Sequence, residues 1–83
     1  MPSNAERIAL AEQAHAFRTS PVYEVVRQQA EADLFLRWKA APTPEDRERC
    51  HAALLGLDAF DGQLLALVND GEMAKRDEQR GRA

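Results

Sequence analysis

Apolar residues recur every three or four positions in the segment that follows Ser20. The residues with this spacing are Tyr23, Val26, Ala30, Leu34 and Trp38. Such spacing places side chains on one face of an α-helix. Ser20 is a good N-cap residue and Pro21 a good first helical residue. The pattern therefore predicts a helix over residues 21–40, whose apolar stripe is widened by Val22, Val25 and Leu36.

A second helix is predicted over residues 44–69, where the periodicity is sharpest. The residues spaced alternately by three and four are Cys50, Ala53, Leu57, Phe60, Leu64 and Leu67. This is the a/d seam of a coiled-coil-like contact. Thr43 and Pro44 suit its start, and Gly71 suits a left-handed residue just after its end. Gly56 and Gly62 lie inside this helix, either tolerated on an exposed face or allowing close approach of another helix.

The two ends of the chain differ in pattern. Ser3 and Glu6 have the spacing of a capping box, and a proline at position 21 disfavours helix at the residue before it, so a shorter helix is predicted over residues 4–18. From Glu72 onward nearly every residue is polar, so this segment buries too little surface to offset the entropy of ordering it. We expect one domain over residues 1–71 and a mobile polar tail over residues 72–83, frayed or disordered.

These elements predict an all-α fold. A connection as short as Ala41-Pro42 implies that the helices over residues 21–40 and 44–69 form an antiparallel hairpin, with the N-terminal helix packed on it. Facing residues then have numbers that add up to about 85. This register predicts an ion pair of Arg27 with Asp58 or with Asp61.

Composition and charge narrow the function classes. The chain has 83 residues, enough for one domain, and residues that favour helices dominate it. Lys and Arg total 11 against 14 Asp and Glu, so the net charge of −3 does not indicate a general polyanion binder. The longest uncharged runs fall far short of the ~20 apolar residues of a membrane span, and the start does not read as a secretory leader. A single cysteine, Cys50, cannot form a disulfide within the chain and fits a reducing compartment such as the cytoplasm.

Candidate chemistry is sparse. Cys50 and His51 are adjacent on a helix and point about 100° apart, so they do not readily share a metal. Asp58 and Asp61 share a helix face, but no third acid or glycine-rich loop converges on them. No phosphate loop, nucleophile elbow or metalloprotease motif is present, and so small a domain has little room for a pocket. We predict no catalytic residues, cofactor, metal or small-molecule substrate.

Nucleic-acid binding is the alternative interpretation. The helix over residues 4–18, the Ser20-Pro21 turn and the next helix could be a helix-turn-helix in a terminase small-subunit-like protein or a transcriptional regulator. A recognition helix presents Arg, Lys, Asn or Gln near its start, whereas this one starts with Val22, Tyr23 and Glu24. Residues 44–69 carry more acids than bases, so a nucleic-acid partner is not expected.

The excess of apolar residues favours protein contacts. More of these residues are present than one hairpin seam can cover, so they meet either the N-terminal helix or another chain. The candidate interface residues are Tyr23, Phe35, Leu36, Trp38, Leu55 and Leu65.

Three features of the sequence together are similar to those of a known group of proteins. They are the stretch from Trp38 to Glu48, the leucines Leu54, Leu57 and Leu64, and residues 70–74 (Asp-Gly-Glu-Met-Ala). Over residues 22–74 the chain resembles small helical proteins from the head-assembly gene clusters of tailed bacteriophages and prophages. The resemblance implies a role in virion assembly or another accessory role of a phage, in the cytoplasm of a bacterial host or in the virion, and it supplies no catalytic residues. Together these observations predict a noncatalytic helical protein that self-associates or docks on a larger protein partner.

Overall fold

The computed structural model describes residues 2–81, and they form three helices joined by short turns. The helices are α1 (Asn4–Arg18), α2 (Pro21–Ala40) and α3 (Pro44–Gly81). No strand occurs within the described chain, so the predicted all-α class is confirmed. The predicted boundaries of α1 and α2 are also correct.

Each helix begins where a hydroxyl side chain caps it. The hydroxyl oxygens of Ser3, Ser20 and Thr43 each accept a hydrogen bond from the backbone N–H three residues later, at 3.2 Å. These bonds satisfy donors that the first turn of a helix leaves free. These capping residues define the starts of the three helices, and all three were predicted from the sequence.

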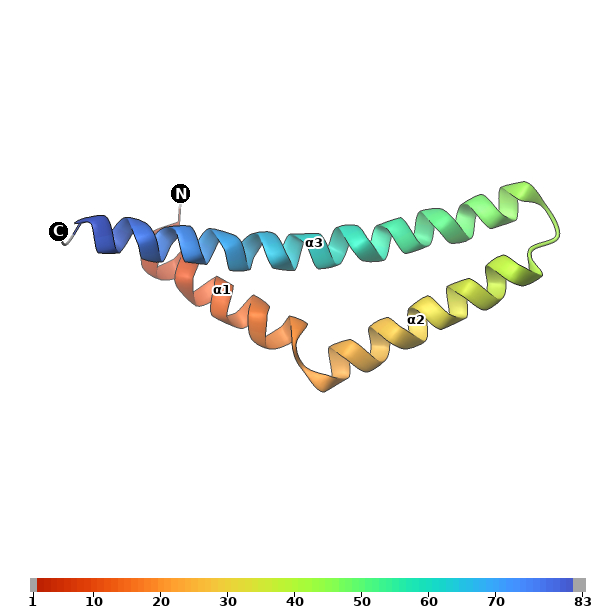
Figure 1. Ribbon diagram of the computed structural model, residues 1–83, viewed down its shortest axis with the longest axis horizontal. Helices are drawn as coiled ribbons and strands as arrows, with labels where there is room; N and C mark the ends of the chain where they lie inside the picture. The colour runs from red at the N-terminus through yellow and green to blue at the C-terminus, as the bar shows by residue number, and fades with distance from the viewer. Residues whose placement is uncertain (1, 82–83) are drawn as a thin grey trace.

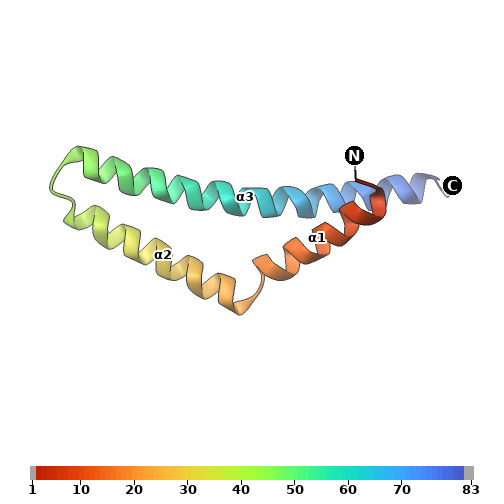
Figure 2. The same ribbon diagram turned by 180° about the vertical axis from the view of Figure 1, so that it is seen from behind.

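The long helix α3 runs the whole length of the molecule, and the two shorter helices, α2 and α1, lie end to end along it (Figure 1). α2 runs antiparallel to the N-terminal half of α3, and after a bend at Thr19 and Ser20, α1 runs along its C-terminal half (Figures 1 and 2). α1 and α2 barely touch each other. The molecule measures 61 × 25 × 17 Å, and its radius of gyration of 17.8 Å exceeds the roughly 12 Å of a compact domain of this length.

The C-terminal end of α3 differs from the prediction. The helix does not end near Asn69 but continues through Gly81, and no described glycine has a positive φ angle. Gly71 is therefore an interior helix residue, and Ala74, within the segment predicted as a tail, is fully buried. Residues 82 and 83 of that predicted tail lie outside the described residues.

The reason for this difference is the position of α1. The N-terminal helix was expected to cover part of the hairpin, and α1 does lie on α3 from Asp61, inside the predicted helix over residues 44–69. It also continues past that helix, to Glu72 and Lys75 in the segment predicted as a tail. A Cβ atom added at Gly71 would lie 2.1 Å from the Cβ atom of Ala11. The glycine serves close helix packing here, and the domain extends past the predicted limit at residue 71.

The seam of α3 follows a different frame from the predicted one. Cys50, Leu57 and Leu64 are partly covered, but the other predicted seam residues, Ala53, Phe60 and Leu67, are exposed. The partly covered residues of this part of α3 are Cys50, Leu54, Leu57, Asp61, Leu64 and Val68. Both frames alternate steps of three and four and share every seventh residue, so periodicity alone does not separate them.

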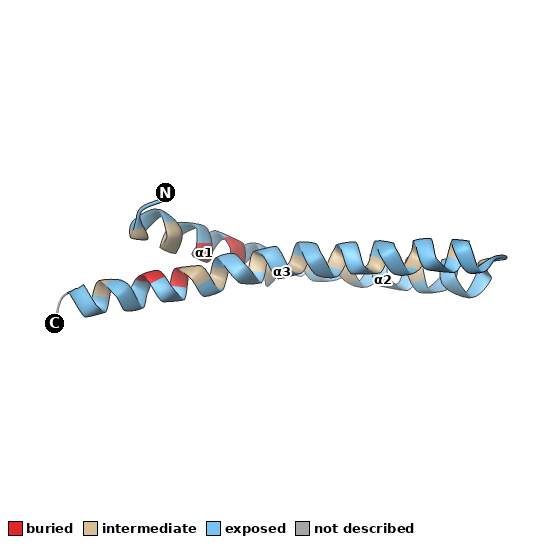
Figure 3. Cartoon of the chain, turned by 90° about the horizontal axis from the view of Figure 1, so that it is seen from above, coloured by how far each residue is buried: buried red, intermediate tan, exposed pale blue. Residues whose placement is uncertain are grey.

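Buried residues occur only where α1 meets α3. Ala11 and Ala14 of α1 and Gly71 and Ala74 of α3 are the buried residues of the described chain (Figure 3). α2 contains none. The core of the single chain is thus made of alanine and glycine, and no large apolar side chain is fully buried in the part described.

Candidate interaction surface

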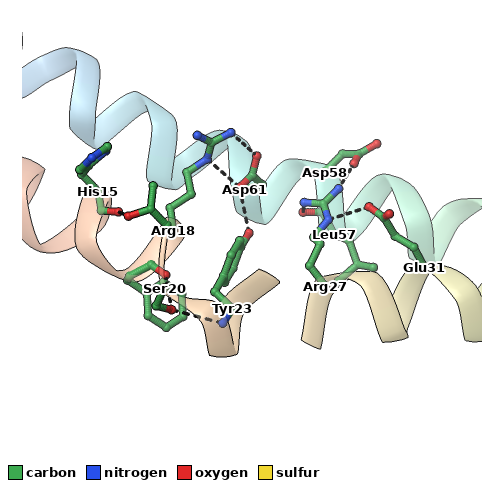
Figure 4. A network of polar contacts seen from close by, with 11 residues as sticks. His15, Arg18, Ser20, Tyr23, Arg27, Glu31, Leu57, Asp58 and Asp61 are labelled. Atoms are coloured by element: carbon green, nitrogen blue, oxygen red, sulfur yellow. Dashed lines mark hydrogen bonds and ion pairs between the residues drawn. The ribbon is translucent and has the colours of Figure 1, made fainter. Parts of the chain in front are cut away.

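A polar junction ties all three helices together at the bend between α1 and α2 (Figure 4). The Arg18 guanidinium donates two hydrogen bonds to the Asp61 carboxylate, from Nε to Oδ1 at 2.9 Å and from Nη2 to Oδ2 at 3.1 Å. The Tyr23 hydroxyl donates to Asp61 Oδ1 at 2.9 Å. The bonds from Arg18 first, and then that from Tyr23, hold the pKa of Asp61 below its usual value. Asp61 can therefore occupy the seam of α3, because its charge is paired.

Tyr23, a candidate interface residue, belongs to this junction. Its ring is only partly exposed and lies 5.1 Å from the ring of Phe17, centroid to centroid. Since its hydroxyl is bound to Asp61, the side chain joins α2 to α3 within the chain. Its position supports a structural function for Tyr23 between the helices rather than an exposed anchor.

The predicted ion pair between Arg27 and Asp58 is present. Arg27 Nη2 bonds the Asp58 carboxylate, Nη1 donates to the backbone oxygen of Leu57 at 3.2 Å, and Nε donates to Glu31 Oε1 at 2.8 Å (Figure 4). Glu31 is the largest cause of the raised pKa of Arg27. The pair confirms the hairpin register, while the alternative partner, Asp61, binds Arg18 instead.

A further ion pair fixes the far end of α1. Arg7 forms a bidentate pair with Asp70, from Nη2 to Oδ1 at 2.7 Å and from Nε to Oδ2 at 2.9 Å, and its Nη1 donates to Asn4 Oδ1 at 2.9 Å. The hydrogen bond from Arg7 is the main reason that the pKa of Asp70 lies below its usual value. The pair of Arg7 with Asp70 was not predicted from the sequence, because the predicted helix ended before Asp70.

An open groove of about 630 Å³ lies between α2 and α3 near their connection. We call it the aromatic groove, and its lining residues are Glu31, Leu34, Phe35, Trp38, Cys50, His51, Leu54 and Asp58. The rings of Phe35 and Trp38 stack with centroids 6.4 Å apart and planes inclined by 14°. The Lys39 ammonium lies 5.5 Å from the Phe35 ring centre, and the Arg47 guanidinium lies 5.8 Å from that of Trp38. Both distances are typical of cation–π contacts.

The other candidate interface residues divide between faces. Leu65 follows His51 and Asp58 at intervals of seven residues, so it extends the α3 wall of the aromatic groove towards the bend. Leu55 is exposed on α3 outside the groove lining. Leu36 is exposed on the side of α2 that faces away from α3, together with Val22 and Val25. The prediction that Val22, Val25 and Leu36 widen the inner stripe of α2 is therefore wrong.

Some exposed apolar residues were not among the candidates. The large apolar residues that are exposed outside the predicted set are Leu10, Phe17, Val22, Val25, Val26, Phe60, Leu67 and Met73. Val26 and Phe60 were expected to face each other inside the seam, yet both are 57 % exposed. For Phe60 and Leu67, the signal in the sequence is the second frame of α3, which turns both side chains outwards.

The Cys50 thiol and the His51 imidazole were expected to point in different directions from the helix. Both residues line the aromatic groove. No hydrogen bond joins them among the described residues, and no group of three or more metal-ligating side chains occurs within residues 2–81. The groove's chemistry is thus apolar and aromatic, with charges only at its edges.

By length and mean hydropathy, one helix of the described chain, α3, reaches the range of a membrane span. Asp58 and Asp61 lie in its apolar part and are bound to Arg27 and Arg18. Charged residues are costly in a bilayer, and helix length and composition alone are weak signs of a span.

The chain matches no protein-family model, no characterised protein and no solved structure. The exposed surface includes the large apolar side chains described above. What this surface can do chemically is exclude water from apolar side chains when another surface covers them.

Proposed function

We propose that this chain is a noncatalytic interaction protein that buries its exposed apolar helix surface against another protein. The observation that carries the proposal is the contrast between its core and its surface. The core consists of Ala11, Ala14 and Ala74, whereas side chains as large as Trp38 and Phe35 are about half exposed. Large aromatic residues supply much of the energy of protein interfaces.

The accessible area supports this proposal. The chain exposes 6424 Å², whereas a compact monomer of this mass exposes about 5,000 Å². The excess of about 1,400 Å² exceeds the ~800 Å² that each partner contributes to an interface of standard size. An interface of standard size would therefore cover a little over half of this excess, and a larger interface would be needed to cover all of it.

The resemblance to phage head-assembly proteins suggests virion assembly as the setting of this interaction, in a bacterial cell or in the virion. The nucleic-acid alternative gains no support from the arrangement of the helices. α1 and α2 barely touch, so they lack the packed pair of a helix-turn-helix. The first turn of α2 presents Val22 and Glu24 to solvent rather than basic side chains.

Site-specific photo-crosslinking in the producing cell tests the proposal. A photoreactive amino acid replaces Phe35, Leu36 or Leu55 in the full chain, and Arg37 in a matched control. Arg37 is 68 % exposed in its side chain and pairs with Asp33 on a polar part of α2. We expect a discrete protein adduct from at least one apolar position and none from position 37. Absence of any protein adduct, or adducts with nucleic acid, would overturn the proposal.

A further inference from the structure

We infer that the aromatic groove is the contact surface of a homodimer in which a second copy lies antiparallel to the first. This inference rests on the proposed function and names its partner. In such a dimer the Phe35 and Trp38 side chains of each copy pack over the groove of the other. The two α2–α3 hairpins then form a four-helix arrangement around a two-fold axis at the groove.

The groove is incomplete within one chain. Its walls are Leu34, Phe35 and Trp38 on α2 and Leu54 on α3, and it is open to solvent along one side of the hairpin. Phe35 remains 58 % exposed and Trp38 45 % exposed, although their rings already stack on each other. α1 does not reach this end of the molecule, because it packs on α3 beyond the hairpin. No described part of the same chain can therefore cover the groove.

A second copy fits the area that has to be covered. The excess accessible surface of about 1,400 Å² per chain is within the range that a subunit buries in a stable homodimer. A two-fold contact buries the same patch on both copies at once, so one interface corrects the excess in both. An isologous contact also supplies aromatic side chains from both sides, and interface hot spots commonly pair in this way.

The charges at the edges of the groove determine the orientation. Lys39 and Arg47 lie at the end near the α2–α3 connection, each within cation–π distance of one aromatic ring. At the other end, Glu31 and Asp58 share one cation, Arg27, so this end carries an excess of negative charge. An antiparallel partner brings its Lys39 and Arg47 towards Glu31 and Asp58 of the first copy. A parallel partner would bring like charges together, which is unfavourable.

The native chain carries a probe for this interface, because Trp38 is its only tryptophan. Sedimentation velocity and tryptophan emission are measured on the same samples as the protein is diluted. We expect a dimer that dissociates on dilution, with Trp38 emission shifting to longer wavelength as the groove becomes exposed. A monomer at every concentration up to the millimolar range would overturn the inference. A dimer whose dissociation leaves Trp38 emission unchanged would also overturn it, because the contact would lie elsewhere.

Phe35→Ala and Leu36→Ala form a matched pair of variants. The two residues are adjacent and similarly exposed, at 58 % and 62 %, but only Phe35 lines the groove. We expect Phe35→Ala to raise the dissociation constant at least about tenfold and Leu36→Ala to change it less than about twofold. Helicity by circular dichroism verifies that both fold. Equal effects of the two variants would contradict a contact through the groove.

Electron-paramagnetic-resonance distances test the orientation. A spin label is placed at Gln63→Cys in a Cys50→Ala background whose dimerisation has first been verified. Gln63 is exposed and outside the groove lining. From the 1.5 Å rise per helical residue, an antiparallel dimer separates the two labelled positions by roughly 30 Å along the axis, and a parallel dimer places them side by side. Side-by-side labels would overturn the antiparallel arrangement.

The failure of this inference is distinguishable from that of the proposed function. A strict monomer that crosslinks to a different protein through Phe35 or Leu55 in cells refutes the homodimer and leaves the proposed function standing. A strict monomer that forms no protein adduct refutes both.

Discussion

The two halves of α3 pack against their partners in opposite ways. Against α1, the C-terminal half packs through Ala11, Ala14, Gly71 and Ala74, all of them buried. Against α2, the N-terminal half packs through partly covered large side chains, and no residue of α2 is buried. Small residues allow two backbones to approach until little surface remains exposed. Large residues hold the backbones apart, and a two-helix layer leaves their sides in contact with water.

Ion pairs show the same difference. Two bidentate pairs, Arg7 with Asp70 and Arg18 with Asp61, hold the two ends of α1 on α3. Between α2 and α3 the direct ion pair is that of Arg27 with Asp58. The contact between α1 and α3 is thus closely packed and charge-paired, whereas the hairpin of α2 and α3 leaves large apolar side chains exposed.

Removal of residues 70–83 has the largest expected effect. The shortened chain loses Asp70, Gly71 and Ala74, and with them the surface that α1 packs on. An isolated helix as short as the 15 residues of α1 is marginal in water, so α1 should unfold. Circular dichroism should show a loss of helical signal larger than the deleted residues account for. If only their own contribution disappears, α1 does not depend on this segment.

Gly71→Ala is expected to destabilise the chain by about 1–3 kcal/mol, the usual cost of overpacking. The added methyl group would lie 2.1 Å from the Ala11 Cβ atom and 3.4 Å from the Arg7 carbonyl oxygen. Urea unfolding at fixed protein concentration measures the change. The double variant Ala11→Gly/Gly71→Ala supplies the control, because it moves the methyl group to the other helix. A double variant no more stable than Gly71→Ala would show that the contact with Ala11 is not the cause.

The sequence was sufficient for the three helix starts and for the hairpin register. Capping residues and prolines marked the starts, and the short connection set the register that predicted a pair of Arg27 with Asp58 or Asp61. The end of α3 could not be predicted in this way. A glycine after a periodic segment suits a helix end as well as a close helix contact, and only the position of α1 decides between them.

The candidate surface could be predicted only in part. Phe35, Trp38 and Leu65 border one side of the hairpin, as a set of exposed apolar residues should, but Leu36 and Leu55 lie on other faces. Most of the difference between the predicted and the observed exposed residues of α3 arises because the wrong one of two heptad frames was assigned to the contact with α2. A frame containing Phe60 and Leu67 is more apolar than one containing Asp61. Arg18 and Tyr23 stabilise the second frame from distant positions in the chain.

Acid should weaken the attachment of α1 through Asp61 and Asp70. Both carboxylates have pKa values below the usual value when folded, chiefly because Arg18 and Arg7 donate hydrogen bonds to them. A lowered folded-state pKa contributes stability that is fully present above the unfolded value of about 4 and is lost as the pH falls through the folded value. Urea unfolding at steps between pH 6 and pH 2.5 should therefore show a decline that begins below about pH 4.

The variant Asp61→Asn/Asp70→Asn is the matching control for the acid effect. It should be less stable than the wild type at pH 6, and its stability should decline less over the acidic range. The variant Asp33→Asn, which alters an ion pair within α2, should follow the wild-type profile. Parallel profiles for the double variant and the wild type would show that the two carboxylates do not carry the pH dependence.

Gly56→Ala has the smallest expected effect and the opposite sign to Gly71→Ala. Gly56 lies in the interior of α3, on the side of the helix that faces away from α2. A Cβ atom added there meets nothing within 4 Å. Replacing an interior helical glycine by alanine stabilises a helix by about 0.5–1 kcal/mol, because alanine loses less backbone entropy. Urea unfolding should therefore shift to higher denaturant concentration with an unchanged slope. A loss of stability would show that position 56 faces a close neighbour in solution, so the open face of the hairpin would extend beyond the aromatic groove.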